Sequence, residues 1–163
     1  MKAVSGLKLV GLHGFFVGGK SDMNPDLELA KTIMREQGQV LALVKAGRVL
    51  GTGERQGVAD LLALAEQLGT QADGAALADR VVGKAAAMIA RTMGVSSVYA
   101  LLASETARWA LAAQDIPLEF DRLVPIILNR NGDGPCPLEK TVADIDNPHE
   151  AVAALRRFIA HRS

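Results

Sequence analysis

Apolar segments with the period of a strand alternate with segments that have the period of a helix along most of this chain. Residues that favour helix ends mark many of the boundaries, such as Asn24 with Pro25 at the first start and Gly38 at its end. In order, the predicted elements are a helix over 24–38, a hairpin over 40–51, a helix over 61–69, a strand over 75–78, a helix over 79–93, a strand over 97–102, a helix over 104–113, strands over 118–121 and 124–128, and helices from 137 and 147. This alternation predicts an α/β fold, a three-layer α/β/α sandwich in which helices cover both faces of a mixed sheet.

The length of the chain fits one domain of this kind. With 163 residues, 49% of them apolar, it can bury a sizeable core. Residues 23–163 are assigned to this domain. Residues 1–22 are predicted to be a poorly ordered extension, because helix start signals begin only at Asn24, and Met23 is then an alternative initiator.

Charge and cysteine content exclude several kinds of partner. Eighteen Lys and Arg balance eighteen Asp and Glu, so the positive surface of a nucleic-acid binder is not expected. The longest apolar stretch near the N-terminus is too short to span a membrane. A single cysteine and three scattered histidines offer no disulfide framework and no metal-ligand spacing, which predicts a cytoplasmic protein without a metal or cofactor. Formation of a homo-oligomer is left open.

One candidate site segment runs from Asp79 to Ala87 and places two cations and a glycine at a predicted helix start. Asp79 is interpreted as the N-cap of this helix, with a functional carboxylate as the alternative. Gly83 in the helix interior permits either close packing or the approach of a ligand. Lys84 lies among apolar neighbours and is either a site cation or part of a solvated stripe with Arg80 and Arg91.

A second candidate segment is the glycine-rich loop from Asn129 that leads into a helix at Pro137. Cys136 and Glu139 have the spacing of a capping box at this helix start. The alternative for Cys136 is a nucleophilic thiol, since a helix N-terminus and nearby cations lower a cysteine pKa. Ser104 is interpreted in the same way, as a helix cap or as a residue that orients a ligand.

The candidate catalytic residues are Lys84, Cys136 and Asp79. The candidate binding residues are Asp79, Gly83, Lys84, Ser104, Asn129, Arg130, Cys136 and Glu139. The aromatic side chains of Trp109 and Phe120 are expected in the core.

Four segments carry a family resemblance: residues 43–47, 78–87, 129–130 and 136–139. Their sequences, in particular Val-Val-Gly-Lys-Ala-Ala-Ala and Cys-Pro-Leu-Glu, are similar to the small prokaryotic family catalogued as domain of unknown function 1893. The resemblance covers about residues 24–160 and implies a cytidine-deaminase-like fold. It implies no established activity.

The resemblance also identifies where this chain departs from true deaminases. Those enzymes hold zinc with a His or Cys at one helix start and two Cys at the next, and use a Glu to transfer protons. The equivalent helix starts here are residues 79–84 and 103–107, and neither contains a zinc-binding set. What the resemblance then implies is a zinc-free pocket between two helix N-termini, suited to an anion or a polar heterocycle.

Two functional hypotheses follow. The first is a zinc-free site for a nucleotide-like or anionic metabolite, with Lys84 and Arg130 as charge partners and Ser104 or Asp79 orienting the ligand. Whether such a site catalyses a reaction is left open. The second is a non-catalytic binding or assembly protein in which the same residues only pack helices together.

Overall fold

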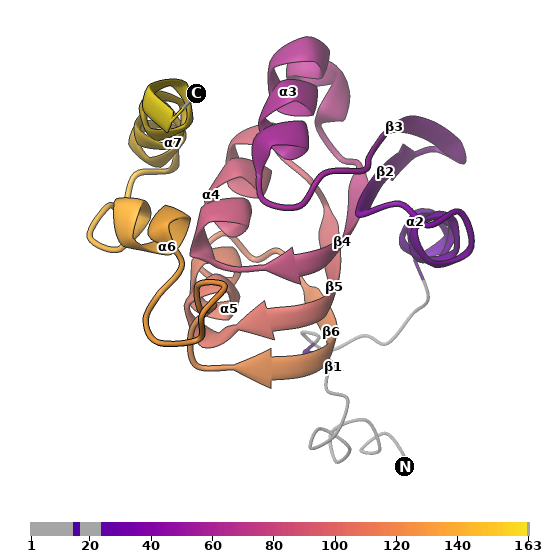
Figure 1. Cartoon of the computed structure of the whole chain (residues 1–163). Helices are drawn as coiled ribbons and strands as arrows, with labels where there is room; N and C mark the ends of the chain where they lie inside the picture. Colours follow the sequence, from indigo (N-terminus) through magenta and orange to yellow (C-terminus); the bar gives the residue numbers. More distant parts are fainter. Residues whose placement is uncertain (1–14, 17–23, 163) are drawn as a thin grey trace.

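The computed structural model describes residues 15–16 and 24–162, which form an α/β domain around a six-stranded mixed sheet (Figure 1). The strand order is β1-β6-β5-β4-β2-β3. Strands β4, β5 and β6 are parallel, whereas β1, β2 and β3 pair antiparallel with their neighbours. The strands are β1 Phe15–Phe16, β2 Leu41–Lys45, β3 Arg48–Gly53, β4 Ala76–Val82, β5 Ser97–Ser104 and β6 Leu118–Val124.

The helices divide unequally between the two faces of the sheet. Among the described helices, α2 covers one face, and α3, α4 and α5 cover the other (Figure 1). Helices α6 and α7 pack on the outer side of α4. The predicted three-layer arrangement is therefore present, with most of the helices on one side. The helices are α2 Pro25–Glu36, α3 Ala59–Leu68, α4 Lys84–Met93, α5 Glu105–Ala112, α6 Pro137–Val142 and α7 Pro148–Arg162.

The first helix and the hairpin begin where the sequence predicts. The Asn24 side chain accepts hydrogen bonds from the amides of Asp26 and Leu27 at 3.0 and 3.1 Å, which caps α2. Ala46 and Gly47 both have positive φ, as a two-residue hairpin turn requires. The carboxylate of Asp26 accepts from both of their amides at 2.8 Å, so the start of α2 also holds the hairpin turn.

The prediction of a helix start at Asp79 is wrong. Asp79 pairs with Leu41 on one side and Ala100 on the other, and β4 continues to Val82. Helix α4 begins only at Lys84, so Gly83 is its N-cap residue and not an interior position. An Asp followed by helix-forming residues is typical of a helix start, which explains the prediction. Here, pairing with two neighbouring strands extends β4 four residues beyond the predicted strand end, from residue 78 to residue 82.

The prediction of two strands over 118–121 and 124–128 is wrong. The structure has one strand there, β6, which runs from Leu118 to Val124, and residues 125–127 are not in a strand. Pro125 follows, and proline has no amide hydrogen to continue the ladder. Ile126 and Leu128 lie in the loop beyond it, where both are exposed and Leu128 makes one isolated bridge to Pro135.

Part of the predicted N-terminal extension joins the sheet. Phe15 and Phe16 pair antiparallel with Glu119 and Leu118 of β6. The rest of residues 1–22 and Met23 lie outside the described residues, so the division of the chain at residue 23 stays a prediction. In the described part of the chain, no helix combines the length and apolar character needed to cross a membrane.

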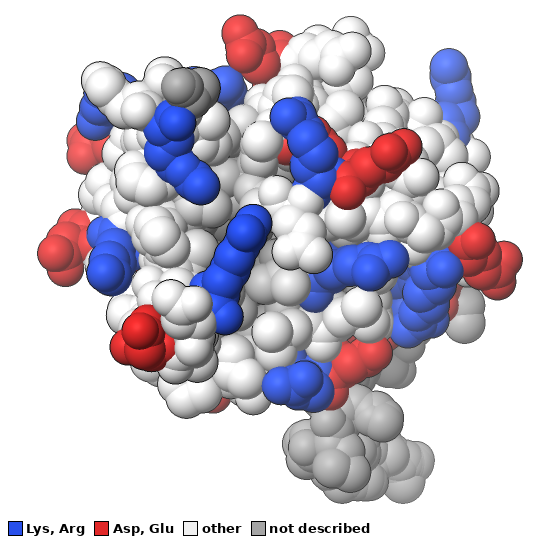
Figure 2. All heavy atoms as spheres, viewed as in Figure 1, with Lys and Arg blue, Asp and Glu red and all other residues white. Residues whose placement is uncertain are grey.

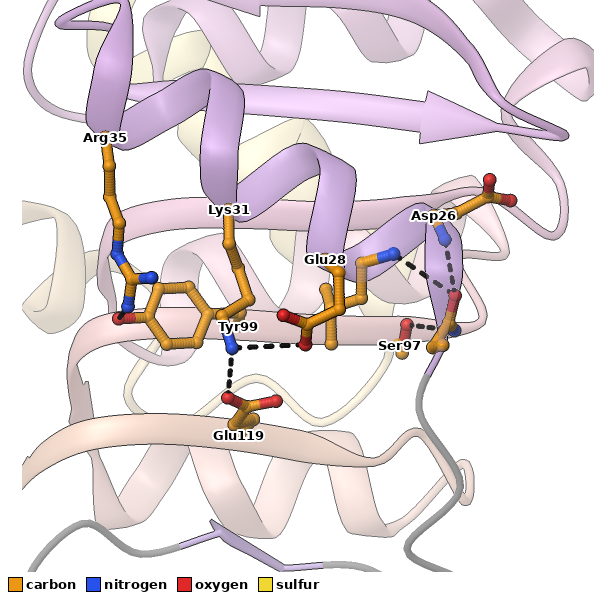
Figure 3. A network of polar contacts seen from close by, with 9 residues as sticks. Asp26, Glu28, Lys31, Arg35, Ser97, Tyr99 and Glu119 are labelled. Carbon is orange, nitrogen blue, oxygen red and sulfur yellow. Dashed lines mark hydrogen bonds and ion pairs between the residues drawn. The ribbon is translucent and has the colours of Figure 1, made fainter.

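A cluster of polar contacts fastens α2 to the sheet (Figure 3). The ammonium group of Lys31 contacts Glu28 at 3.3 Å and also Glu119 of β6. Arg35 donates a hydrogen bond of 2.9 Å to the hydroxyl of the fully buried Tyr99, and both cations lie over its ring. Burial, together with Asp121, raises the pKa of Tyr99 to about 12. Lys31 thus connects α2 to β6, and Arg35 connects it to β5.

Candidate functional site

A cleft with a volume of about 600 Å³ opens on the face of the sheet that α3, α4 and α5 cover. It lies between α4, α5 and the segment that runs from β6 into α6. Most of its wall is apolar, and its charged residues come from three different elements. The lining residues are Lys84, Met88, Arg91, Thr106, Trp109, Ala110, Ala113, Ile126, Pro135, Glu139, Lys140, Ala143 and Asp146. We call this hollow the α4–α5 cleft.

Three cations face the α4–α5 cleft: Lys84, Arg91 and Lys140. The ammonium group of Lys84 donates to the carbonyl oxygen of Ala143 at 3.0 Å. Arg91 donates from Nε to the side chain of Gln114 at 2.9 Å. Lys140 is exposed on α6. Both acceptors are neutral, so neither of these two hydrogen bonds joins Lys84 or Arg91 to a carboxylate.

Glu139 of α6 caps a helix other than its own. Its carboxylate oxygens accept from the backbone amides of Lys84 at 2.8 Å and Ala85 at 3.0 Å, in the first turn of α4. A carboxylate at a helix N-terminus is stabilised by the free amides and by the helix dipole. Burial raises the pKa of the Glu139 carboxyl above its usual range, although these amides and the charge of Lys84 act in the opposite direction. The capping box predicted between Cys136 and Glu139 is therefore wrong.

Gly83 is explained by this contact. A Cβ atom built at Gly83 would lie 2.5 to 2.8 Å from the carboxylate atoms of Glu139. Since real Cβ atoms essentially never come under 3.0 Å, any larger residue would push Glu139 away from α4. The absence of a side chain at Gly83 therefore lets Glu139 pack closely against the start of α4. Of the two predicted explanations for this glycine, close packing is the one that the structure supports.

Ser104 is the N-cap of α5, which confirms the first of its two predicted roles, that of a helix cap. Its hydroxyl accepts from the amide of Ala107 at 3.0 Å and shares a hydrogen bond of 2.9 Å with the hydroxyl of Thr106. The side chain of Ser104 is fully buried and does not line the α4–α5 cleft, whereas Thr106 does.

Asp79 lies in the interior of the sheet and is only 3% exposed. Its carboxyl accepts a long hydrogen bond, 3.5 Å, from the amide of Val81. Burial raises the pKa of Asp79 to about 8, against the smaller opposing effect of nearby amides. Asp79 therefore stands apart from the cleft as a buried carboxyl with no cationic partner among its described contacts.

The loop before α6 is organised by its own residues. The side-chain oxygen of Asn129 accepts from the amides of Gly132 and Asp133 at 2.8 and 3.2 Å. Arg130 is exposed, and Cys136 is half-buried at the start of α6 without a side-chain cap bond. None of these residues lines the α4–α5 cleft; the loop contributes Ile126 and Pro135 instead.

Of the eight predicted binding residues, the structure brings Lys84 and Glu139 to the cleft. The expectation that Trp109 is a core residue is wrong, since its side chain is 64% exposed, whereas Phe120 does pack against the core. The alternative of a solvated helical stripe of Arg80, Lys84 and Arg91 is also wrong, because Arg80 lies in β4 and not in the helix.

A sequence signal for the missed cleft residues did exist. The cleft residues of α4 have helical spacing, i, i+4 and i+7: they are Lys84, Met88 and Arg91. The cleft residues in and just after α5 also have helical spacing, i, i+3, i+4 and i+7: they are Thr106, Trp109, Ala110 and Ala113. These are two facing helical stripes. Their meeting depended on the packing of α4 against α5, which periodicity does not reveal.

The described side chains do not form a zinc-binding set. Within residues 15–16 and 24–162, no three His, Cys, Asp or Glu side chains lie close enough together to hold a metal ion. The first turns of α4 and α5 present Lys84, Ala85, Glu105 and Thr106, which lack the nitrogen and sulfur ligands that zinc prefers.

We expect the purified protein to contain far less than one zinc ion per chain. Elemental analysis after purification without added metal, before and after treatment with a chelator, tests this expectation. A stoichiometric zinc that resists the chelator would contradict it.

These features define an α/β protein with a mainly apolar cleft between α4, α5 and α6 that three cations line. The family model described as Domain of unknown function (DUF1893) matches residues 29–159, and the chain belongs to this family. The structure is similar to the crystal structure of a DUF1893 family protein, TM1506 from Thermotoga maritima, with a TM-score of 0.75 and 22% sequence identity. The match covers 91% of this chain and 97% of that one, and it shows a shared fold. No curated protein matches the chain.

Proposed function

We propose that this chain binds a small anionic molecule in the α4–α5 cleft without the help of zinc. The observation that carries the proposal is the convergence of Lys84, Arg91 and Lys140 on one mainly apolar hollow of about 600 Å³. Sites for small molecules are typically of this size and combine an apolar wall with a few polar groups that orient the ligand.

The charges of the cleft favour an anion. Three cations and two carboxylates, those of Glu139 and Asp146, line the cleft. The Glu139 carboxylate is already engaged by two amides of α4, so it acts as a part of the helix start. An anionic ligand would exchange the neutral acceptor of Lys84, the carbonyl of Ala143, for a charged one, and a charge-assisted hydrogen bond is the stronger of the two.

The deaminase-like relationship belongs to the same proposal. Its support is architectural: α4 and α5 begin directly after the parallel strands β4 and β5, at the same edge of the sheet. No reaction is assigned. Ser104 and Asp79 are buried, and Cys136 does not line the cleft, so the candidate nucleophile and acid lie away from the ligand.

We also propose a cytoplasmic protein that does not act on nucleic acid, in line with its single cysteine and its balanced charge. Figure 2 shows Lys and Arg side chains spread over one face of the molecule, interspersed with Asp and Glu and with uncharged surface. A surface of this kind lacks a continuous positive track for a phosphate backbone.

A second candidate function is a non-catalytic binding or assembly protein. The roles of Gly83, Glu139 and Ser104 at the starts of α4 and α5 favour it, because these residues are explained by helix capping alone. Under this function, substitutions at these positions change stability, and no anion binds the cleft.

The first experiment is a ligand screen on the wild-type protein. Trp109 is the only tryptophan of the chain and lines the cleft, so its fluorescence reports on ligands bound there. Pyrophosphate, citrate and nucleoside phosphates are titrated, and melting temperature is measured in parallel. We expect at least one of these anions to change the emission saturably and to raise the melting temperature. If none does either, the second function is favoured.

A further inference from the structure

We infer that the ligand of the α4–α5 cleft is an aromatic anion, a molecule in which a planar ring is joined to a phosphate or carboxylate group. This inference rests on the proposed function and narrows it to a substrate class. Its basis is the position and exposure of Trp109, together with the size of the cleft.

Trp109 is unusual in leaving 64% of its side chain exposed. Tryptophan buries more apolar surface than any other side chain when it is covered, so an uncovered ring on a cleft wall is a ready contact surface. In the described part of the chain, cations lie over the rings of Tyr99 and Phe158 and not over Trp109. The ring of Trp109 is therefore not shielded by a cation.

The neighbours of Trp109 extend the apolar wall. Ala110 and Ala113 lie on the same side of α5, and Ile126 and Pro135 come from the loop after β6. The two alanines have small side chains, and Ile126 is 36% exposed. A flat group that slides along Trp109 would cover all of these side chains at once.

The three cations of the cleft come from α4 and α6 and not from α5. Lys84 and Arg91 are seven residues apart on α4, and Lys140 comes from α6. The cleft thus has an aromatic wall on α5 and a basic wall on α4 and α6. An anion without a ring would leave Trp109 uncovered, and a ring without a charge would leave Lys84 and Arg91 with neutral acceptors only.

Size supports the same conclusion. A cleft of about 600 Å³ is far larger than a phosphate ion needs and suits a molecule of drug-like dimensions. Two sources share the required chemistry, a nucleoside monophosphate and a simple aryl phosphate, and binding measurements distinguish them.

The test compares phosphates that share one charged group and differ in the ring. Adenosine 5′-monophosphate, phenyl phosphate and ribose 5-phosphate are titrated calorimetrically into the full-length wild-type protein. We expect one or both of the aromatic phosphates to bind on the order of tenfold more tightly than ribose 5-phosphate, as stacking on an aromatic side chain would give. The compound that does so identifies the source of the ring.

Trp109→Leu and Trp109→Phe locate the contact. We expect Trp109→Leu to remove the advantage of the aromatic phosphates and to leave the affinity for ribose 5-phosphate unchanged. Trp109→Phe should keep most of the advantage because it retains a ring. Since Trp109 is largely exposed, neither variant should lose the fold, and thermal unfolding verifies this.

Each remaining outcome overturns a distinct claim. Equal binding of all three phosphates, or an aromatic advantage that survives in Trp109→Leu, overturns the inference and leaves the anion site standing. Binding of none of them, although another anion of the screen binds, overturns the inference alone. Binding of none of them, with no response in the screen of anions above, overturns the proposed function and the inference with it.

Discussion

Replacing Gly83 by alanine is expected to lower the free energy of unfolding by about 1 to 3 kcal/mol, the cost of leaving buried polar groups without their partners. The added Cβ atom would lie within 2.5 to 2.8 Å of the Glu139 carboxylate and displace it from α4. The amides of Lys84 and Ala85 would then lack their acceptor, and a largely buried carboxylate would lose both of its amide donors. Urea denaturation of wild type and variant measures the effect.

Gly134→Ala is the matched control for this prediction. Gly134 also has no positive φ, and a Cβ atom there would meet only the side chain of Asn129 at an ordinary 3.7 Å. Its effect should stay within about 0.5 kcal/mol, as for most surface changes. Glu139→Ala alone should cost nearly as much as Gly83→Ala, and the double variant much less than the sum. Additive effects, or a harmless Gly83→Ala, would show that the cap contributes little.

Replacing Asp79 by asparagine is expected to remove a large dependence of stability on pH. The pKa of Asp79 is raised to about 8 in the folded protein, whereas an unfolded Asp titrates near its usual value of about 3.9. Between these values the folded state holds a proton that the unfolded state has lost. The stability that this carboxyl contributes is therefore full below about pH 4 and is lost as the pH rises toward 8.

Urea denaturation from pH 4 to 9 tests the Asp79 prediction. The wild-type protein should lose several kcal/mol across this range through Asp79, and Asp79→Asn should flatten that part of the curve, since an amide does not ionise. The exposed Asp144 gives the control Asp144→Asn, which should leave the wild-type curve nearly unchanged. A wild-type slope that persists in Asp79→Asn would mean that another group causes it.

Much of the fold could be predicted because its signals are local. Asn24 with Pro25 and Ser104 mark helix starts through hydrogen bonds within a few residues, and the structure confirms both caps. The errors arise where distant segments decide. Residues 79–82 form a strand because Leu41 and Ala100 flank Asp79 in the sheet. Both partners are distant in the sequence, so no local pattern predicts these pairings.

The candidate site was less predictable than the fold. The sequence singled out Lys84 and Glu139, which do meet, but the contact joins the backbone of α4 to a carboxylate 55 residues later. Trp109 was expected in the core because its side chain is large and aromatic. Its exposure depends on how α5 packs, which the sequence around it does not reveal. Side chains that line a cleft have no local partner in the chain, so their role appears only when the helices are placed.

Binding by Lys84→Met, compared with the wild-type protein, tests the anion site most directly. Methionine has a similar volume without the charge, and the backbone amide of Lys84 would keep its bond to Glu139. The bond that is lost, to the carbonyl of Ala143, is exposed, so the free energy of unfolding should change by no more than about 0.5 kcal/mol. Lys45→Met is the control, because Lys45 also donates to a backbone carbonyl and lies outside the cleft.

The decisive measurement is the dissociation constant of the anion selected by the screen, obtained by calorimetry for wild type, Lys84→Met and Lys45→Met. We expect Lys84→Met to weaken binding by at least about tenfold, the loss of one charge-assisted contact, and Lys45→Met to bind as the wild type does. An unchanged dissociation constant in Lys84→Met, with its fold intact, would contradict the assignment of the α4–α5 cleft as an anion site.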